Sequence, residues 1–191
     1  MHSGRKLVVT QNITVDGVID AAGGWFDASG GEEGVDQTDV IEAVQEESHT
    51  SDAILLGRVT FEQMRGFWPV LESDSTGVRD HLNRVHKYVF SRTLESPGWE
   101  PATMLRGPVL EEVRSLKAQP GLDLICTGSM SLMPELVSSG LVDEYRLFVY
   151  PVVIGRGQRL FAEGTRKLGL RLVEARPFRS GLVLLRYRPQ V

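Results

Sequence analysis

The middle of the sequence alternates short apolar runs with segments of helical periodicity, and this alternation constrains the fold most. Ala53-Ile54-Leu55-Leu56 is a continuous apolar run that stops at Gly57, and Val59–Phe67 then has helical spacing. The same succession returns at Asp123–Cys126 followed by Leu132–Ser139. Short apolar runs that alternate with helices are typical of a largely parallel sheet buried on both faces.

The flanking segments extend this pattern and then change it. We expect further strands at Lys6–Ile13, Lys87–Phe90, Ala102–Leu105 and Glu144–Ile154, and helices at Asp36–Ser51 and from Gly107-Pro108 onward, with Pro108 at the first helical position. Leu170–Ala175 and Leu182–Tyr187 have no helix between them, so they predict antiparallel edge strands. The sequence therefore predicts a three-layer α/β fold, with helices on both faces of a mixed, mostly parallel sheet. Its 191 residues suit one domain, 1–191.

Composition and motif searches exclude several classes of function. A net charge of −4 favours neither nucleic-acid nor membrane partners. Cys126 is the single cysteine, so an intrachain disulfide and a cysteine-rich zinc site are excluded, and the four histidines have no metal-ligand spacing. No P-loop motif and no signal-peptide pattern occurs. We expect a cytoplasmic protein without a metal ion.

Charge is distributed unevenly along the chain. No lysine or arginine lies between Lys6 and Arg58, whereas eleven carboxylates do; from Arg166 onward seven basic residues accompany Glu174 alone. Either an anionic ligand is attracted to one side of the molecule, or the two segments lie side by side and neutralise one another. The second interpretation is the more common one for charge runs.

Three expected strand ends carry groups that suit phosphate. They are Gly57, Arg58 and Thr60; Ser91 and Arg92; and Gly128, Ser129 and Met130. Glycine permits close backbone approach, hydroxyls and helix N-termini bind phosphate, and arginine binds it through two hydrogen bonds. Each end alone fits ordinary turn chemistry. Because all three should meet at the carboxyl edge of one sheet, together they predict an extended phosphate-bearing ligand across that edge.

At these segments the chain resembles dihydrofolate reductase and, more closely, the reductase domain of the bifunctional riboflavin-biosynthesis deaminase/reductase and its stand-alone bacterial relatives. The resemblance rests on Thr14–Gly17, on Leu55–Glu62, and on a late block that runs from Gly140 through Leu147 and Pro151–Gly155 to Arg159–Phe161. It implies a dihydrofolate-reductase-like fold, NADPH as cofactor, and a homodimer formed through the strands around Tyr145–Val153. An apolar strand run of that kind fits a buried core strand equally well.

The resemblance also assigns roles to residues. Gly57, Arg58 and Thr60 would bind cofactor phosphates, Ser91 and Arg92 would surround the 2′-phosphate, and Gly128, Ser129 and Met130 would contact the pyrophosphate. Asp16 would be the catalytic candidate beside the nicotinamide, although a role in turn formation is equally plausible. Glu144 and Pro151 would shape the sheet end or the substrate pocket, and we assign Trp25 to the pocket as well. Trp25 lies in a glycine-rich loop and would either cap the ligand or fasten that loop to the core.

Three functions follow from this comparison. The closest family activity is the NADPH-dependent reduction of 5-amino-6-(5-phosphoribosylamino)uracil, a hydride transfer to a small heterocyclic or ribosyl substrate. A non-enzymatic nucleotide-binding sensor on the same fold is an alternative. A true dihydrofolate reductase is a third, which the sequence favours least because Asp39 and Glu42 do not match the first-helix carboxylate motif of that enzyme.

Overall fold

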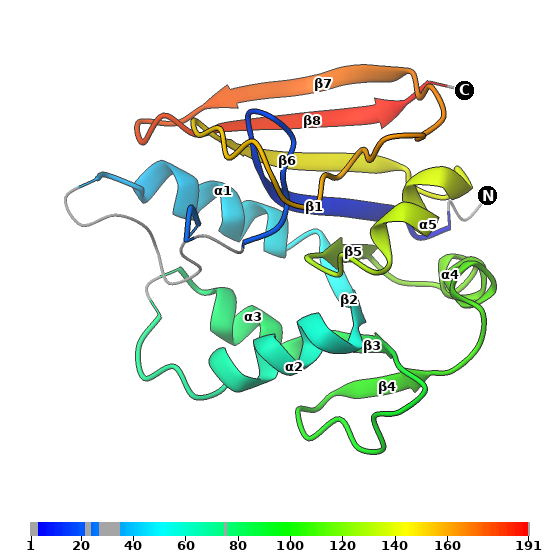
Figure 1. Cartoon of the computed structure of the whole chain (residues 1–191). Helices are drawn as coiled ribbons and strands as arrows, with labels where there is room; N and C mark the ends of the chain where they lie inside the picture. The colour runs from blue at the N-terminus through cyan, green and yellow to red at the C-terminus, as the bar shows by residue number, and fades with distance from the viewer. Residues whose placement is uncertain (1–3, 22–23, 27–34, 75, 191) are drawn as a thin grey trace.

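The structure of the protein is a computed structural model, and it describes residues 4–21, 24–26, 35–74 and 76–190. Its strands form one eight-stranded sheet in the order β4-β3-β2-β5-β1-β6-β8-β7 (Figure 1). The strands are β1 Leu7–Thr14, β2 Ser51–Gly57, β3 His86–Phe90, β4 Ala102–Leu105, β5 Asp123–Thr127, β6 Glu144–Tyr150, β7 Leu170–Pro177 and β8 Val183–Pro189. The first six run parallel, and β8 and β7 are antiparallel. The predicted mixed α/β sheet is confirmed.

Apolar side chains of the central strands alternate between two cores, because successive residues of a strand point to opposite faces. In β2, Ala53 and Leu55 join one cluster, while Ile54 and Leu56 join the other. The first cluster is covered by α4 (Val109–Lys117) and α5 (Met133–Ser139), and the second by α2 (Arg58–Phe67) and α3 (Val78–Arg84). Both faces of the sheet are therefore buried, which explains the continuous apolar runs.

The helix α1 (Thr38–Ser48) packs in a third cluster beside β6 and β8. Arginines of the C-terminal strand pair and its connecting turn form ion pairs with acidic residues of α1 and with Asp36, two residues before the helix. The pairs are Arg176–Glu46, Arg179–Asp36, Arg179–Asp39 and Arg186–Glu47. The uneven charge along the chain is thus largely neutralised between segments that lie side by side, as the second interpretation expected.

Several element boundaries differ from the prediction. The helix α3 was not predicted, because only Val78 and Leu82 in its seven residues are apolar and its start depends on a turn. In that turn the Asp74 carboxylate accepts backbone N–H groups from Thr76 and Arg79 at 2.8 Å each. Pro108 is the N-cap of α4 rather than its first residue. β6 ends at Tyr150, short of Ile154.

β6 is an interior strand, paired with β1 on one side and β8 on the other. The apolar side chains of β6 therefore pack in the core, and both of its backbone edges are hydrogen-bonded to neighbouring strands. On that side β7 is the outermost strand of the sheet, where Leu172 and Val173 are exposed. A homodimer stays a prediction, and strand pairing through β6 cannot form it. Among the described helices none is long and apolar enough to cross a membrane.

Candidate functional site

Two turns at the carboxyl edge of the sheet are hydrogen-bonded to each other. The Gly57 N–H donates to Ser129 Oγ, and the Ser129 N–H donates to Thr60 Oγ1, both at 2.9 Å. A Cβ on Gly128, whose φ is +61°, would lie 2.8 Å from Thr60 Cγ2. The β2–α2 and β5–α5 turns therefore form one close-packed unit, in which two of the three predicted strand ends meet.

The N-terminus of α2 suits an anion better than that of α4 does. No side chain caps the first turn of α2, and that turn holds no acidic residue. The first turn of α4 holds Glu111 and Glu112, and Glu112 Oε1 accepts the Gly107 N–H at 3.2 Å. Because a helix N-terminus carries partial positive charge and free N–H donors, the open end of α2 has the chemistry that a phosphate group requires.

The third strand end lies beside this unit, since Gly57 and Phe90 are partners in the β2–β3 register. Ser91 Oγ accepts the N–H groups of Thr93 and Leu94, and Ser91 and Arg92 line a depression of about 380 Å³. Arg92 is exposed, as is Arg58, which pairs with Glu62 at 2.7 Å. The structure therefore brings all three predicted strand ends to one edge.

Arg106 also lines this depression and was missed by the sequence analysis. It donates to the carbonyl oxygens of Ser91 at 3.0 Å and Leu94 at 2.9 Å. Arg106 directly follows β4, the neighbour of β3, so the rule that pointed to Ser91 and Arg92 would have found it too. The depression thus carries two guanidinium groups.

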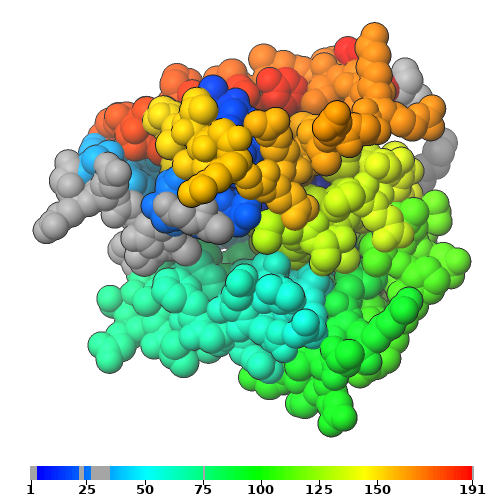
Figure 2. Space-filling view, in the orientation of Figure 1, coloured from blue at the N-terminus to red at the C-terminus, as the bar shows by residue number. Residues whose placement is uncertain are grey.

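A larger cavity of about 400 Å³ opens on the other side of Thr60 and Gly128, which line it. It lies between α1, α2, α3 and the strands β1 and β6. In the space-filling view, the blue and yellow parts of the molecule lie above the cyan-to-green part, and the two meet along a seam (Figure 2). The cavity walls are mainly apolar and aromatic: Ile19, Trp25, Phe26, Val40, Ile41, Val44, Ile54, Met64, Trp68, Val78, Leu82, Ile125, Phe148 and Tyr150.

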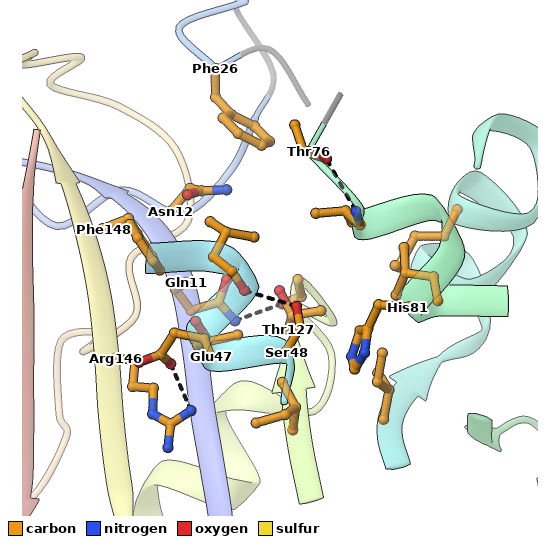
Figure 3. A pocket seen from close by; sticks show the side chains of 18 of the residues that line it. Gln11, Asn12, Phe26, Glu47, Ser48, Thr76, His81, Thr127, Arg146 and Phe148 are labelled. Atoms are coloured by element: carbon orange, nitrogen blue, oxygen red, sulfur yellow. Dashed lines mark hydrogen bonds and ion pairs between the residues drawn. The ribbon is translucent and has the colours of Figure 1, made fainter. Parts of the chain in front are cut away.

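Polar groups are concentrated at a few places of this cavity. Glu47 and Arg146 lie together at one end and form an ion pair of 2.6 Å, while His81 lies on the α3 side (Figure 3). Burial raises the pKa of Glu47, against the effect of Arg146. Burial also lowers the pKa of His81 to about 4, helped by Arg84, so its imidazole is neutral at pH 7.

Glu144 was expected to shape the sheet end or the substrate pocket, and the structure corrects this. It is the first residue of β6, at the amino edge, is fully buried, and does not line the cavity. Its carboxylate accepts hydrogen bonds of 2.8 to 3.1 Å from Arg146, Arg186 and Arg188. Burial favours the neutral acid, but the bonds from Arg146 and Arg186 prevail and lower its pKa to about 2. Glu144 therefore holds the arginines in place.

Asp16 takes the turn role that the sequence analysis left open. Its carboxylate accepts the Thr14 hydroxyl at 2.6 Å and the Gly155 N–H at 2.8 Å, which lower its pKa. It thus fastens the β1 turn to the loop after β6, and it does not line the large cavity. Pro151 is exposed and also lies outside that cavity.

The remaining candidates lie at or near the cavity. Trp25 lines it, and its ring makes an edge-on contact with Tyr150, with 5.4 Å between the ring centroids. The Trp25 Nε1–H donates to the Asp20 carbonyl at 2.7 Å, so the side chain both fastens its loop and faces the cavity. The carbonyl of Met130, whose residue is partly exposed, accepts a hydrogen bond from Gln158 at 2.9 Å.

Comparison with known proteins agrees with this geometry. The chain is 33% identical over 186 residues to the uncharacterized protein YyaP of Bacillus subtilis (strain 168), covering 96% of this chain and 94% of that one. A Shewanella sp. PV-4 protein, whose name gives it a provisional role in riboflavin biosynthesis, superposes with a TM-score of 0.70 at 21% identity, covering 97% of this chain and 99% of that one.

Dihydrofolate reductase from Enterococcus faecalis, solved with NADP(H), superposes with a TM-score of 0.63 at 16% identity, covering 97% of each chain. This likeness establishes a dihydrofolate-reductase-like fold. The family model of the RibD C-terminal domain matches residues 5–184. That match spans both turns of the carboxyl edge and the late strand block, and the chain therefore belongs to the RibD C-terminal domain family.

Proposed function

We propose that this protein is an NADPH-dependent reductase. The observation that carries the proposal is the position of the Thr60–Ser129 unit, which lies between a depression with two arginines and a mainly apolar cavity. A dinucleotide needs both environments, because its phosphates require cations and N–H donors while its nicotinamide ring packs against apolar surface. When bound, NADPH supplies the hydride.

The residues present fit such a cofactor. The uncapped N-terminus of α2 offers free N–H donors, and the absence of a side chain at Gly57 and Gly128 lets Ser131 and Thr60 pack closely against these turns, which fixes the N-terminus of α2 at this edge. Ser91, Arg92 and Arg106 supply the hydroxyl and guanidinium groups that a 2′-phosphate requires. This chemistry favours NADPH over NADH.

The cavity differs from that expected of a folate-reducing enzyme. Its α1 wall presents Val40, Ile41 and Val44, whereas Asp39 accepts the Arg179 backbone N–H and Glu42 does not line the cavity. Among the described residues of α1, Glu47 is the carboxylate that reaches the cavity, and it forms an ion pair with Arg146. We therefore propose reduction of a small heterocyclic compound. The 5-amino-6-(5-phosphoribosylamino)uracil of the riboflavin pathway is the reference substrate against which others are compared.

The cofactor assignment is tested by titrating the protein with NADPH and NADH and following nicotinamide fluorescence. Arg92→Ala should weaken NADPH binding about tenfold, or about 1.4 kcal/mol, because one charged contact to the 2′-phosphate is lost. NADH, which lacks that phosphate, should change by less than about twofold. Arg171→Ala, an exposed arginine of β7, is the matched control and should change neither.

Equal losses for both cofactors in Arg92→Ala would contradict the 2′-phosphate contact, and no saturable NADPH binding by the wild type would refute the reductase. Turnover decides between an enzyme and a sensor. A sensor would bind NADPH without oxidising it in the presence of pyrimidine, flavin-pathway or pterin compounds, whereas the proposed reductase consumes NADPH with one of them.

A further inference from the structure

The charges at the end of the large cavity specify the class of compound that it accepts. We propose that the substrate is an uncharged, planar aromatic heterocycle without a phosphate group. This inference rests on the proposed reductase function and narrows it, because it places the phosphoribosyl compound outside the preferred substrates.

The described lining of the cavity offers no cation that is free to bind a phosphate. Two basic side chains reach it, His81 and Arg146. His81 is neutral at pH 7, since burial lowers its pKa to about 4. The Arg146 side chain is only 3% exposed and forms ion pairs with Glu47 at 2.6 Å, Glu144 at 2.8 Å and Asp123 at 3.5 Å. Its donors are therefore already taken by carboxylates.

The cluster around Arg146 has an excess of negative charge. Its ion pairs join three arginines, Arg146, Arg186 and Arg188, to four carboxylates, Glu47, Glu144, Asp123 and Glu174. The formal charge of the cluster is thus −1, and Glu47 is the carboxylate of this group that lines the cavity. A phosphate monoester, with about −1.5 to −2 charges at pH 7, would be repelled there and would lose its hydration without compensation.

Apart from the N-terminus of α2, where Thr60 lines the cavity and where the proposed cofactor places its phosphates, the described cavity wall offers no unpaired positive charge to offset this repulsion. The sequence from residue 7 to residue 57, which supplies β1, α1, β2 and the loops between them, contains no lysine or arginine. At the N-terminus of α1, where positive partial charge would favour an anion, Asp36 and Asp39 are already paired with Arg179. On this side of the described lining, an anionic substrate therefore meets the Glu47 carboxylate and no lysine or arginine that would offset it.

The apolar walls favour a flat aromatic ring. Trp25, Phe26 and Tyr150 contact one another with ring centroids 5.4 to 6.0 Å apart and line the same cavity as Phe148. Aromatic side chains bind planar rings by stacked or edge-on packing. A neutral planar ring can pack against these walls without losing the hydration of a charged group.

The test compares two probes that differ by a phosphate: 4-methylumbelliferone and 4-methylumbelliferyl phosphate. Both are titrated calorimetrically into the full chain at pH 7, where the umbelliferone is mainly neutral and the phosphate ester carries about −1.5 to −2 charges, without NADPH. Phosphate buffer is used, so that inorganic phosphate competes for the helix N-termini. We expect the neutral probe to bind saturably and the ester to bind at least about tenfold more weakly, since repulsion at short range in a partly buried site is large. Equal or tighter binding of the ester, or no binding of the neutral probe, overturns the proposal.

Glu47→Gln tests the cause of the selectivity, because it removes one negative charge at nearly constant shape. The variant should bind the ester several-fold more tightly than the wild type does. The ratio of the dissociation constants of the two probes should therefore decrease. Glu46→Gln makes the same change on the neighbouring residue, which pairs with the surface Arg176, and should leave the ratio unchanged. A ratio that is unaffected in Glu47→Gln, or equally affected in both variants, contradicts the charge argument.

Two further measurements keep the outcome decisive. If Glu47→Gln does not fold, the wild-type titrations are repeated at high ionic strength; screening should narrow the ratio, and a ratio independent of salt contradicts the proposal. The NADPH titration is performed separately. A protein that binds NADPH but prefers the ester refutes only the substrate class, whereas one that selects the neutral probe but does not bind NADPH refutes only the reductase.

Discussion

Replacing Gly128 by alanine tests the close packing on which the candidate site depends. The added Cβ would lie 2.8 Å from Thr60 Cγ2, a distance that real Cβ atoms do not tolerate, and the residue would have to keep its φ of +61°. Two separate costs therefore arise: the left-handed backbone of an L-residue, about 1–2 kcal/mol, and overpacking against Thr60, about 1–3 kcal/mol. We expect Gly128→Ala to lower the free energy of unfolding by about 2–5 kcal/mol.

A second substitution separates the two costs. Thr60→Ser removes the methyl group that clashes and keeps the hydroxyl that accepts the Ser129 N–H at 2.9 Å. The double variant should recover the overpacking part and retain a loss of about 1–2 kcal/mol. Gly140→Ala is the matched control, since Gly140 has a φ of +71° but a Cβ added there would meet no atom within 4 Å. Gly140→Ala should lower the free energy of unfolding by about 1–2 kcal/mol, and Thr60→Ser should not recover this loss.

Urea unfolding of the wild type and the five variants gives the double-mutant cycles directly. For a chain of this size, each kcal/mol corresponds to roughly 2–4 °C in Tm, so thermal unfolding gives an independent check. Because Thr60 belongs to the first turn of α2, NADPH affinity should fall in Gly128→Ala and stay unchanged in Gly140→Ala. The reasoning is refuted if Thr60→Ser restores none of the free energy of unfolding that Gly128→Ala loses, or if it restores the same amount in both glycine variants.

Two buried charges give predictions with opposite pH dependence. Lys87 is fully buried, donates a hydrogen bond to the Val85 carbonyl, and has its pKa lowered to about 8 by burial. Lys87→Met should therefore raise the free energy of unfolding by about 2 kcal/mol at pH 7. This gain should shrink as the pH rises from about 8 to 10.5, because the wild-type lysine then loses its charge in the folded protein. The exposed Lys167→Met is the control, and a destabilised Lys87→Met would contradict this account. Glu144→Gln should lower the free energy of unfolding by about 3 kcal/mol at pH 7, because the Glu144 carboxylate has its pKa lowered to about 2 in the folded protein. The stabilisation by Glu144 is complete above pH 4.5 and is lost as the pH falls through 2. Urea midpoints of the wild type and Glu144→Gln measured across pH test this prediction, and an undiminished difference between the two midpoints at pH 2 would contradict it.

Much of the fold could be predicted because its signals are local. The alternation of Ala53 and Leu55 with Ile54 and Leu56 between two cores needs only the two-residue period of a strand, and the apolar run already showed that both faces are buried. The short helix α3 escaped prediction because a turn around Asp74, rather than a periodic apolar stripe, starts it.

The meeting of the three strand ends at one edge was predictable for a similar reason. In a parallel sheet every strand ends at the same edge, so Thr60, Ser91 and Gly128 had to come together once their strands were identified. The roles taken from sequence resemblance were less secure at Asp16 and Glu144. Their residue types fit a pocket, but the Gly155 N–H that Asp16 accepts lies more than 100 residues away in the chain, and the arginines Arg186 and Arg188 that bind Glu144 lie about 40 residues away.

The sequence by itself determined the strands, the glycine and hydroxyl turns that end them, and the absence of basic residues between Lys6 and Arg58. Only the tertiary structure decided that Arg146 is enclosed by carboxylates from α1, β5 and β6, and that Glu47 faces the cavity. The physical reason is that the secondary structure a residue prefers depends mainly on its neighbours in the chain. Its effective charge depends on which remote groups burial brings within a few ångströms.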